Sequence, residues 1–90
     1  MTEDQFKTHV ATNGYGEVSS AVYKPNTAND FHTHEFSAAL LVTDGLFTLG
    51  LEDGPQVFAA GEWCELGAGT VHFEKTEAEG ATVLFAKRTD

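Results

Sequence analysis

The chain has 90 residues, the length of one small domain, and 41% of them are hydrophobic, which is enough for a compact core. Fourteen acidic residues oppose five Lys and Arg, giving a formal charge of −9 that disfavours nucleic acid and anionic membrane surfaces as partners. No apolar run approaches the roughly 20 residues that span a bilayer, and the acidic N-terminal segment does not resemble a secretory signal. The single cysteine, Cys64, excludes an intramolecular disulfide. We therefore expect one cytoplasmic domain over residues 1–90.

The first dozen residues predict a short amphipathic helix. Thr2 and Gln5 have the spacing of a capping box, and Phe6 and Val10 lie four residues apart on one face. Asn13-Gly14 is typical of a helix end, because Gly accepts the left-handed backbone conformation. A helix this short is weak alone, so we expect it to cover one face of a sheet.

After the helix, the sequence predicts short strands separated by turn residues. Asp44-Gly45 is typical of a hairpin, and residues 52–55, Glu-Asp-Gly-Pro, predict a further turn. Many short strands of this kind favour an all-β antiparallel sandwich or barrel. The expected strands cover residues 18–23, 31–43, 46–51, 56–59, 62–66, 71–76 and 81–87.

Three of the four histidines have a spacing that suits a metal ion. His32 and His34 are two residues apart in one expected strand, so their side chains point to the same face. His72 lies in another expected strand, and neutral imidazole is a common ligand of divalent metals. The three residues predict a single metal site, although ordinary surface histidines are the alternative for a His-x-His pair alone.

The residues around His32 and His34 resemble the first motif of the cupin superfamily. That motif runs Gly, five residues, His-x-His, three or four residues, Glu, six residues, Gly; here Asn26 stands at the first Gly and Gly45 at the last. The position of the motif's Glu is taken by Ala38, which cannot bind a metal ion.

The residues around His72 resemble the second cupin motif. That motif runs Gly, five residues, Pro-x-Gly, two residues, His, three residues, Asn; here Gly61 opens it, residues 67–69 (Gly-Ala-Gly) replace Pro-x-Gly, and Thr76 stands for Asn. Fifteen residues separate the two motifs. The resemblance implies a small, jelly-roll-like antiparallel β-barrel that holds one Zn, Ni, Fe or Mn ion.

Glu74 is the candidate catalytic residue. It alternates with His72 and Thr76, so it would face the pocket as a fourth metal ligand or as a base beside a metal-bound water. Alternatively, the strand bends and Glu74 is a solvated charge at the barrel mouth, because a buried isolated carboxylate is costly. By contrast, Glu35 is expected to point outward.

Alternation also assigns the remaining side chains to two faces of the barrel. From His34 onward, Phe36, Ala38 and Leu40 should point inward, so that wall of the pocket is apolar. The opposite face carries Ser37, Ala39 and Leu41, is unusually apolar for solvent, and suggests a homodimer. We expect Cys64 to be structural and Trp63 to be a possible dimer contact. Core positions are expected for Phe31, Phe36, Phe47 and Phe85.

Two functions fit these observations. The first is a mononuclear metal enzyme, of the dioxygenase or the lyase and isomerase type, acting on a small molecule. We expect that molecule to be neutral, because the cations fall near strand ends, opposite to the ligand face, or on the helix. The second is a non-catalytic cupin module that binds a metal or a small ligand. The cations concerned are Lys7, Lys24, Lys75, Lys87 and Arg88.

Overall fold

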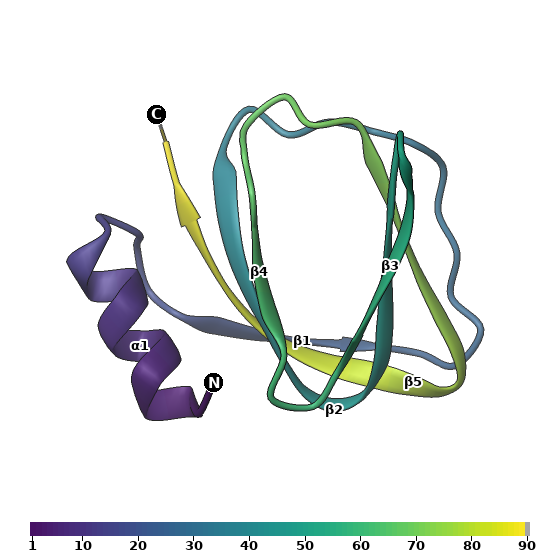
Figure 1. The fold of residues 1–90 in the computed structure, drawn as a ribbon, viewed down its shortest axis with the longest axis horizontal. Helices are drawn as coiled ribbons and strands as arrows, with labels where there is room; N and C mark the ends of the chain where they lie inside the picture. The colour runs from purple at the N-terminus through teal and green to yellow at the C-terminus, as the bar shows by residue number, and fades with distance from the viewer. Residues whose placement is uncertain (90) are drawn as a thin grey trace.

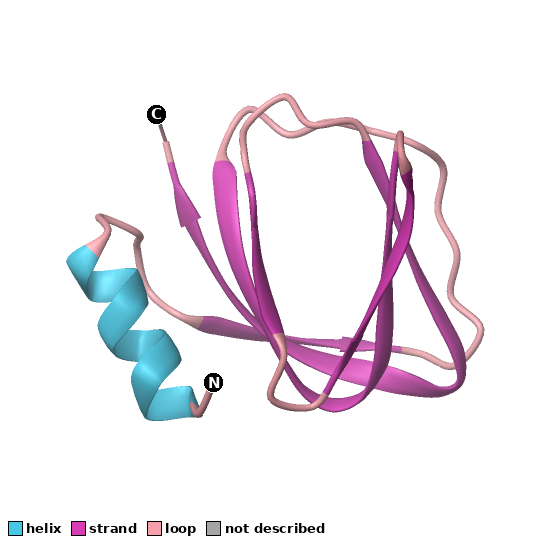
Figure 2. Cartoon of the chain, viewed as in Figure 1, coloured by secondary structure: helices cyan, strands magenta, loops and turns pink. Residues whose placement is uncertain are grey.

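The computed structural model describes residues 1–89, in which antiparallel strands curl into a barrel and one helix lies outside it (Figure 1, Figure 2). The strand order is β1-β5-β2-β3, and β4 also pairs with β2. Within these residues, no helix has the length and apolarity needed to cross a membrane. The elements are α1 (Glu3–Thr12), β1 (Ser19–Tyr23), β2 (Ser37–Leu51), β3 (Gly54–Ala59), β4 (Trp63–Leu66) and β5 (His72–Arg88).

The frame of the barrel is the pair of long strands β2 and β5, which bend together near their middles. Their pairing register shifts between Val42 and Asp44 and again between Gly45 and Phe47. Gly45 has φ 75° and Gly80 has φ 66°, the left-handed values that allow a bulge to redirect a strand. Each strand therefore continues through its bend and closes the barrel instead of ending in a turn.

The expected hairpin at Asp44-Gly45 is wrong. These residues lie inside β2, and the strands expected at 31–43 and 46–51 merge there into one strand that begins at Ser37. The strands expected at 71–76 and 81–87 likewise merge into β5. The Asp-Gly signal marks a need for positive φ, which a hairpin turn and a bulge share.

The bends also exchange the two faces of each long strand. On β2, Ala38 lines the barrel interior before the bend and Leu49 lines it afterwards. On β5, Glu74 lines the interior before the bend and Phe85 lines it afterwards. Inward residues thus change from even to odd numbers along both strands, because the pairing register of β2 and β5 shifts at the two irregularities.

Helix α1 covers the outer face of the sheet, as predicted. The capping box is present, with Gln5 N–H donating to Thr2 Oγ1 and Thr2 N–H donating to Gln5 Oε1. Phe6 is fully buried and Val10 is 3% exposed, in one cluster with residues of β2 and β5. Burying an amphipathic stripe in this way stabilises a helix that would be marginal alone.

The outer face of β2 is therefore not free for a dimer partner, so the surface expected for the dimer is wrong. Ala39 is fully buried and Leu41 is 1% exposed, both within the cluster under α1. Trp63 also packs against this cluster, and its ring centre lies 4.8 Å from that of His9 on the helix. The apolar positions that suggested a second subunit contact the chain's own helix.

The barrel interior holds a second cluster, and it includes Phe47 as expected. Cys64 packs against this cluster, and burial, with a smaller effect of the Glu65 charge, raises its pKa to about 11. The thiol therefore stays protonated near neutral pH, which supports a structural role. Phe31 does not join the core: it is 56% exposed and contacts Phe73 edge-on.

We predict that Gly45→Ala destabilises the protein far more than Gly61→Ala. A Cβ at Gly45 would lie 2.2 Å from the Gly80 carbonyl oxygen, whereas a Cβ at Gly61 meets nothing within 4 Å. Both glycines have positive φ, so both substitutions carry the same kind of backbone cost. In urea unfolding, Gly61→Ala should cost about 1–2 kcal/mol, and Gly45→Ala at least about 3 kcal/mol. Equal losses would mean that contact across the bend does not constrain the fold.

Candidate metal centre

The backbone brings His32, His34 and His72 together although they come from separate segments. The segment between β1 and β2 runs beside β5 (Figure 1), and His32 and His72 exchange two backbone hydrogen bonds of 2.8 and 3.0 Å. Gly69 N–H donates to the His34 carbonyl at 2.9 Å, which ties the loop before β2 to the loop before β5. The ring centres of the three histidines are 4.3 to 5.1 Å apart. The predicted trio is therefore assembled, with His32 and His34 placed just before β2 instead of within it.

Hydrogen bonds fix the tautomers of His32 and His72. Nδ1 of His32 lies 2.8 Å from the Asp30 carbonyl oxygen, and Nδ1 of His72 lies 2.8 Å from the Thr70 carbonyl oxygen. A carbonyl only accepts, so each Nδ1 carries a proton, and in the neutral imidazole each Nε2 then presents a lone pair to the cluster. Backbone carbonyls often orient metal-binding histidines in this way.

His34 is held by stacking. Its ring lies over that of Phe36 at 4.7 Å with an angle of 19° between the planes. Burial lowers its pKa, and the neighbouring His72 and His32 lower it further, more than Glu74 raises it. The neutral, ligand form of the imidazole is thereby favoured near neutral pH.

Glu74 lies beside the histidines, on the face that alternation with His72 predicts. Its side chain is 16% exposed, and its Oε1 is 2.9 Å from His32 Nε2 and 3.9 Å from His72 Nε2. Tyr23 donates its hydroxyl to Glu74 Oε2 at 3.0 Å, and Asn29 donates to Oε1 at 3.1 Å while accepting from the Glu74 amide at 2.7 Å. The carboxylate is thus oriented toward the cluster and is not a solvated charge at the barrel mouth.

Sequence reasoning missed Tyr23 and Asn29, the two residues that position Glu74. Burial raises the pKa of the Tyr23 phenol far above its usual value, and the Glu74 charge adds to the effect. The hydroxyl therefore remains a donor to the carboxylate at any physiological pH. Tyr23 lies at the end of β1, which pairs with the far half of β5, and no sequence spacing links it to Glu74.

Four potential ligand atoms, one each from His32, His34, His72 and Glu74, lie within 4.8 Å of one another. Nε2 of His32 and Oε1 of Glu74 lie 2.9 Å apart, a distance at which the two atoms can share either a proton or a metal ion. Ligands about 2.1 Å from one ion are about 3.0–3.4 Å apart in octahedral or tetrahedral geometry, so these donors fit a divalent metal after small side-chain shifts.

A pocket of about 450 Å³ adjoins these donors. Phe36, Ala38 and Leu40 line it as alternation predicted, and this wall is apolar. Phe85 and Lys87 line it too, which overturns two expectations: that Phe36 and Phe85 are core residues, and that Lys87 faces away from the ligands. Alternation counted from His72 failed at Lys87 because the bulge near Gly80 exchanges the faces of β5. The signal was present as a glycine in the middle of an otherwise continuous strand pattern.

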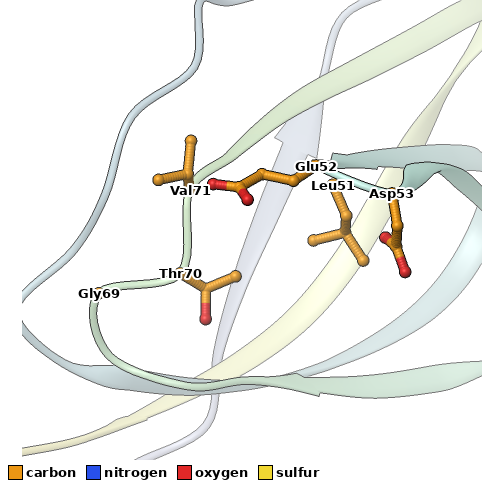
Figure 3. Close-up of a pocket in the computed structure, with 6 residues that line it drawn as sticks. All are labelled: Leu51, Glu52, Asp53, Gly69, Thr70 and Val71. Atoms are coloured by element: carbon orange, nitrogen blue, oxygen red, sulfur yellow. The ribbon is translucent and has the colours of Figure 1, made fainter.

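A second hollow, of about 460 Å³, lies at the turn between β2 and β3 (Figure 3). The side chains of Glu52 and Asp53 point in different directions there, and no histidine, cysteine or cation is among its lining residues. This hollow therefore lacks the converging donors that distinguish the pocket beside His72.

No family model and no curated protein matches the chain. Solved structures do match. A protein of unknown function from Rhizobium leguminosarum superposes with a TM-score of 0.76 and 15% identity, over 81% of this chain and 69% of the other. A cupin-2 domain protein from Shewanella frigidimarina superposes with a TM-score of 0.70 and 16% identity, over 87% of this chain and 72% of the other. The polyketide cyclase RemF from Streptomyces resistomycificus superposes with a TM-score of 0.69 and 20% identity, over 82% of this chain but only 55% of the cyclase. The chain therefore has the cupin fold that its motifs resemble.

Proposed function

We propose that the protein is a mononuclear metal enzyme whose divalent ion is held by His32, His34, His72 and Glu74. The observation that supports this most strongly is the convergence of three imidazoles and one carboxylate beside an apolar-walled pocket. Three nitrogen donors and one oxygen donor suit Zn, Fe, Ni or Mn. Such an ion, when bound, polarises an oxygen of a bound molecule or activates water or dioxygen.

The surrounding residues have definite tasks in this proposal. Asp30 and Thr70 carbonyls hold the Nδ1 protons of His32 and His72, so that each Nε2 stays a donor. Tyr23 binds Glu74 Oε2 and leaves Oε1 directed at the histidines. The apolar wall opposite excludes bulk water from part of the pocket, which strengthens electrostatic interactions there.

The reaction class depends on the metal. An iron site of this composition would suit a dioxygenase, and a zinc or nickel site would suit lyase or isomerase chemistry. A protein without stoichiometric metal would be a non-catalytic module that binds a small ligand. Elemental analysis of protein purified without chelating resin separates these cases.

We predict that replacing His34 and His72 together with Ala abolishes stoichiometric metal. Both residues supply donors to the same cluster, and two remaining donors hold a divalent ion weakly. Elemental analysis should give about one metal per chain in the parent and much less than one in the double variant. Replacing His9 with Ala is a control, because His9 lies on α1 and contacts Trp63. Full occupancy in the double variant would exclude this site.

Glu74→Gln should weaken metal binding by at least about tenfold, because losing a direct ligand should cost no less than losing a group that only orients one. The amide keeps the shape of the side chain and loses its charge, so the three histidines stay assembled without the anionic ligand. Competition with a chelator measures the affinity, and X-ray absorption measures the change in coordination. Glu79→Gln removes one charge from an exposed position of the same strand and should bind metal like the parent. Unchanged affinity and coordination in Glu74→Gln would show that Glu74 is not a ligand.

We also propose a homodimer, on a surface other than the one first expected. We propose a cytoplasmic location as well, because a single cysteine gives this sequence no intramolecular disulfide. β1 is at the edge of the sheet, carries no charged residue or proline, and exposes Val22 at 77%. An unprotected edge of this kind favours pairing with a second copy. Light scattering at tens of micromolar should give the dimer mass, and Val22→Lys should give the monomer. A monomeric parent would reject the proposal.

A further inference from the structure

Lys87 is a cation that faces the pocket, and no carboxylate of residues 1–89 pairs with it. It pairs with Ala38 across β2 and β5 and lines the pocket wall that Ala38 also lines. The residue is exposed, and its Nζ lies 4.6 Å from the centre of the Phe36 ring and 5.7 Å from that of Phe85, so the ammonium contacts two aromatic rings and stays accessible to a ligand. Among residues 1–89 it forms no ion pair, whereas Lys75 on the same strand pairs with Glu77.

Phe36 connects this ammonium to the histidine cluster. The ring stacks on His34 at 4.7 Å, so Lys87, Phe36 and His34 form a continuous row along the pocket. Both spacings in the row are short, so a molecule of a few carbon atoms would reach from Lys87 to the donor atoms. The lysine is near enough for its charge to lower the pKa of His34.

The charge of the pocket differs from that of the chain. The protein carries a formal −9, yet Lys87 and Glu74 are the only Asp, Glu, Lys or Arg among the residues that line this pocket. Glu74 is engaged with His32, Tyr23 and Asn29, so Lys87 is the charged group left for a ligand. A divalent ion at the donors would make the pocket net positive inside an acidic protein, and such a local field attracts anions.

We propose that the ligand of this pocket is a small organic acid, with its anionic group paired to Lys87 and its apolar body lying against Phe36 and Phe85. Lys87 determines which molecules the pocket binds. This role rests on the proposed function at one point: a metal ion at the histidines would bind a second polar group of the same molecule. The neutral ligand expected from the sequence is replaced by an anionic one. The rest of the wall, formed by Ala38, Leu40 and Leu66, suits a hydrocarbon or aromatic body.

The test compares two carboxylates, benzoate and phenylacetate, with their neutral amides, benzamide and phenylacetamide. Dissociation constants come from NMR titration of the full chain in metal-free form and after loading with Zn²⁺. Lys87→Met keeps the length of the side chain and removes the charge, and Lys87→Arg restores it. Lys7→Met changes the net charge by the same amount on the exposed face of α1. Backbone NMR spectra report whether each variant is folded.

In either metal state, Lys87→Met should weaken carboxylate binding about three- to tenfold and amide binding less than twofold. Lys87→Arg should recover most of the carboxylate affinity, and Lys7→Met should bind both probes like the parent. Added salt should weaken carboxylate binding in the parent more than in Lys87→Met. Together these results would establish Lys87 as the anion receptor.

Three outcomes would overturn the inference: equal loss of carboxylate and amide binding, no loss of either, or binding of no carboxylate by the parent. The same samples give metal content independently. A protein that takes up no metal but keeps the Lys87-dependent preference for carboxylates would refute the metal enzyme and leave the anion site standing. A protein that binds stoichiometric metal but shows no Lys87-dependent preference for carboxylates would refute the anion site and leave the metal site standing.

Discussion

The barrel and its pocket both depend on the point where the bends of β2 and β5 meet. A side chain at Gly45 would lie 2.2 Å from the Gly80 carbonyl oxygen, so the two backbones can touch only without a Cβ there. Gly80 is equally confined, with the Tyr23 carbonyl oxygen 2.5 Å from its ideal Cβ position. The backbones of β1, β2 and β5 therefore meet in close contact around Gly45 and Gly80. That contact turns two long strands into the walls of a barrel, and it exchanges their faces so that the far halves also line the interior.

The glycines of the two cupin-like motifs have a shared physical basis. Gly61 and Gly69 of the second motif have φ of 89° and 79°, and Gly45 of the first has 75°. Asn26, which replaces the first Gly of the first motif, is the one non-glycine residue with positive φ in the chain as described, at 58°. Asn is among the residues that tolerate this conformation. The departure at Asn26 therefore preserves the backbone turn, whereas the departure at Ala38 changes the chemistry of the site.

Alternation of side chains along β5 correctly placed the site residues before the bend and failed for those beyond it. His72 and Glu74 are two residues apart on one regular stretch, so their common face could be read from the sequence. Phe85 and Lys87 lie beyond the bulge at Gly80, where the count of faces shifts by one. A glycine within a strand pattern is consistent with a turn, a bulge or a plain strand, and only the register with β2 decides among them. The cation of the pocket was therefore misplaced while its carboxylate was placed correctly.

The helix also shows what the sequence pattern alone could not predict. The stripe of Phe6 and Val10 and the apolar outer face at Ala39 and Leu41 were both recognisable in the sequence, but as two separate features. The structure makes them one interface, because Gly14 redirects the chain so that α1 lies back over β2. Sequence periodicity states that a face must be covered and does not state by what. The same apolar pattern on β2 is satisfied whether the chain's own helix or a second subunit packs against it.

The site reaches a carboxylate by a different route from the motif it resembles. Ala38 leaves the β2 wall apolar, and the carboxylate comes from β5, where Glu74 lies across from Leu49. This relocation carries a requirement, because an anionic side chain at 16% exposure needs donors to offset lost hydration. Tyr23 and Asn29 supply them, from β1 and from the segment that follows it. The pocket therefore gains an uninterrupted apolar wall, from Ala38 toward Lys87, that a β2 carboxylate would have divided. The acidic group and the basic group now lie on opposite halves of the bent strand β5. Because Glu74 and Lys87 lie on either side of the bend, the bend and not their spacing in the sequence determines how a bound molecule can contact both.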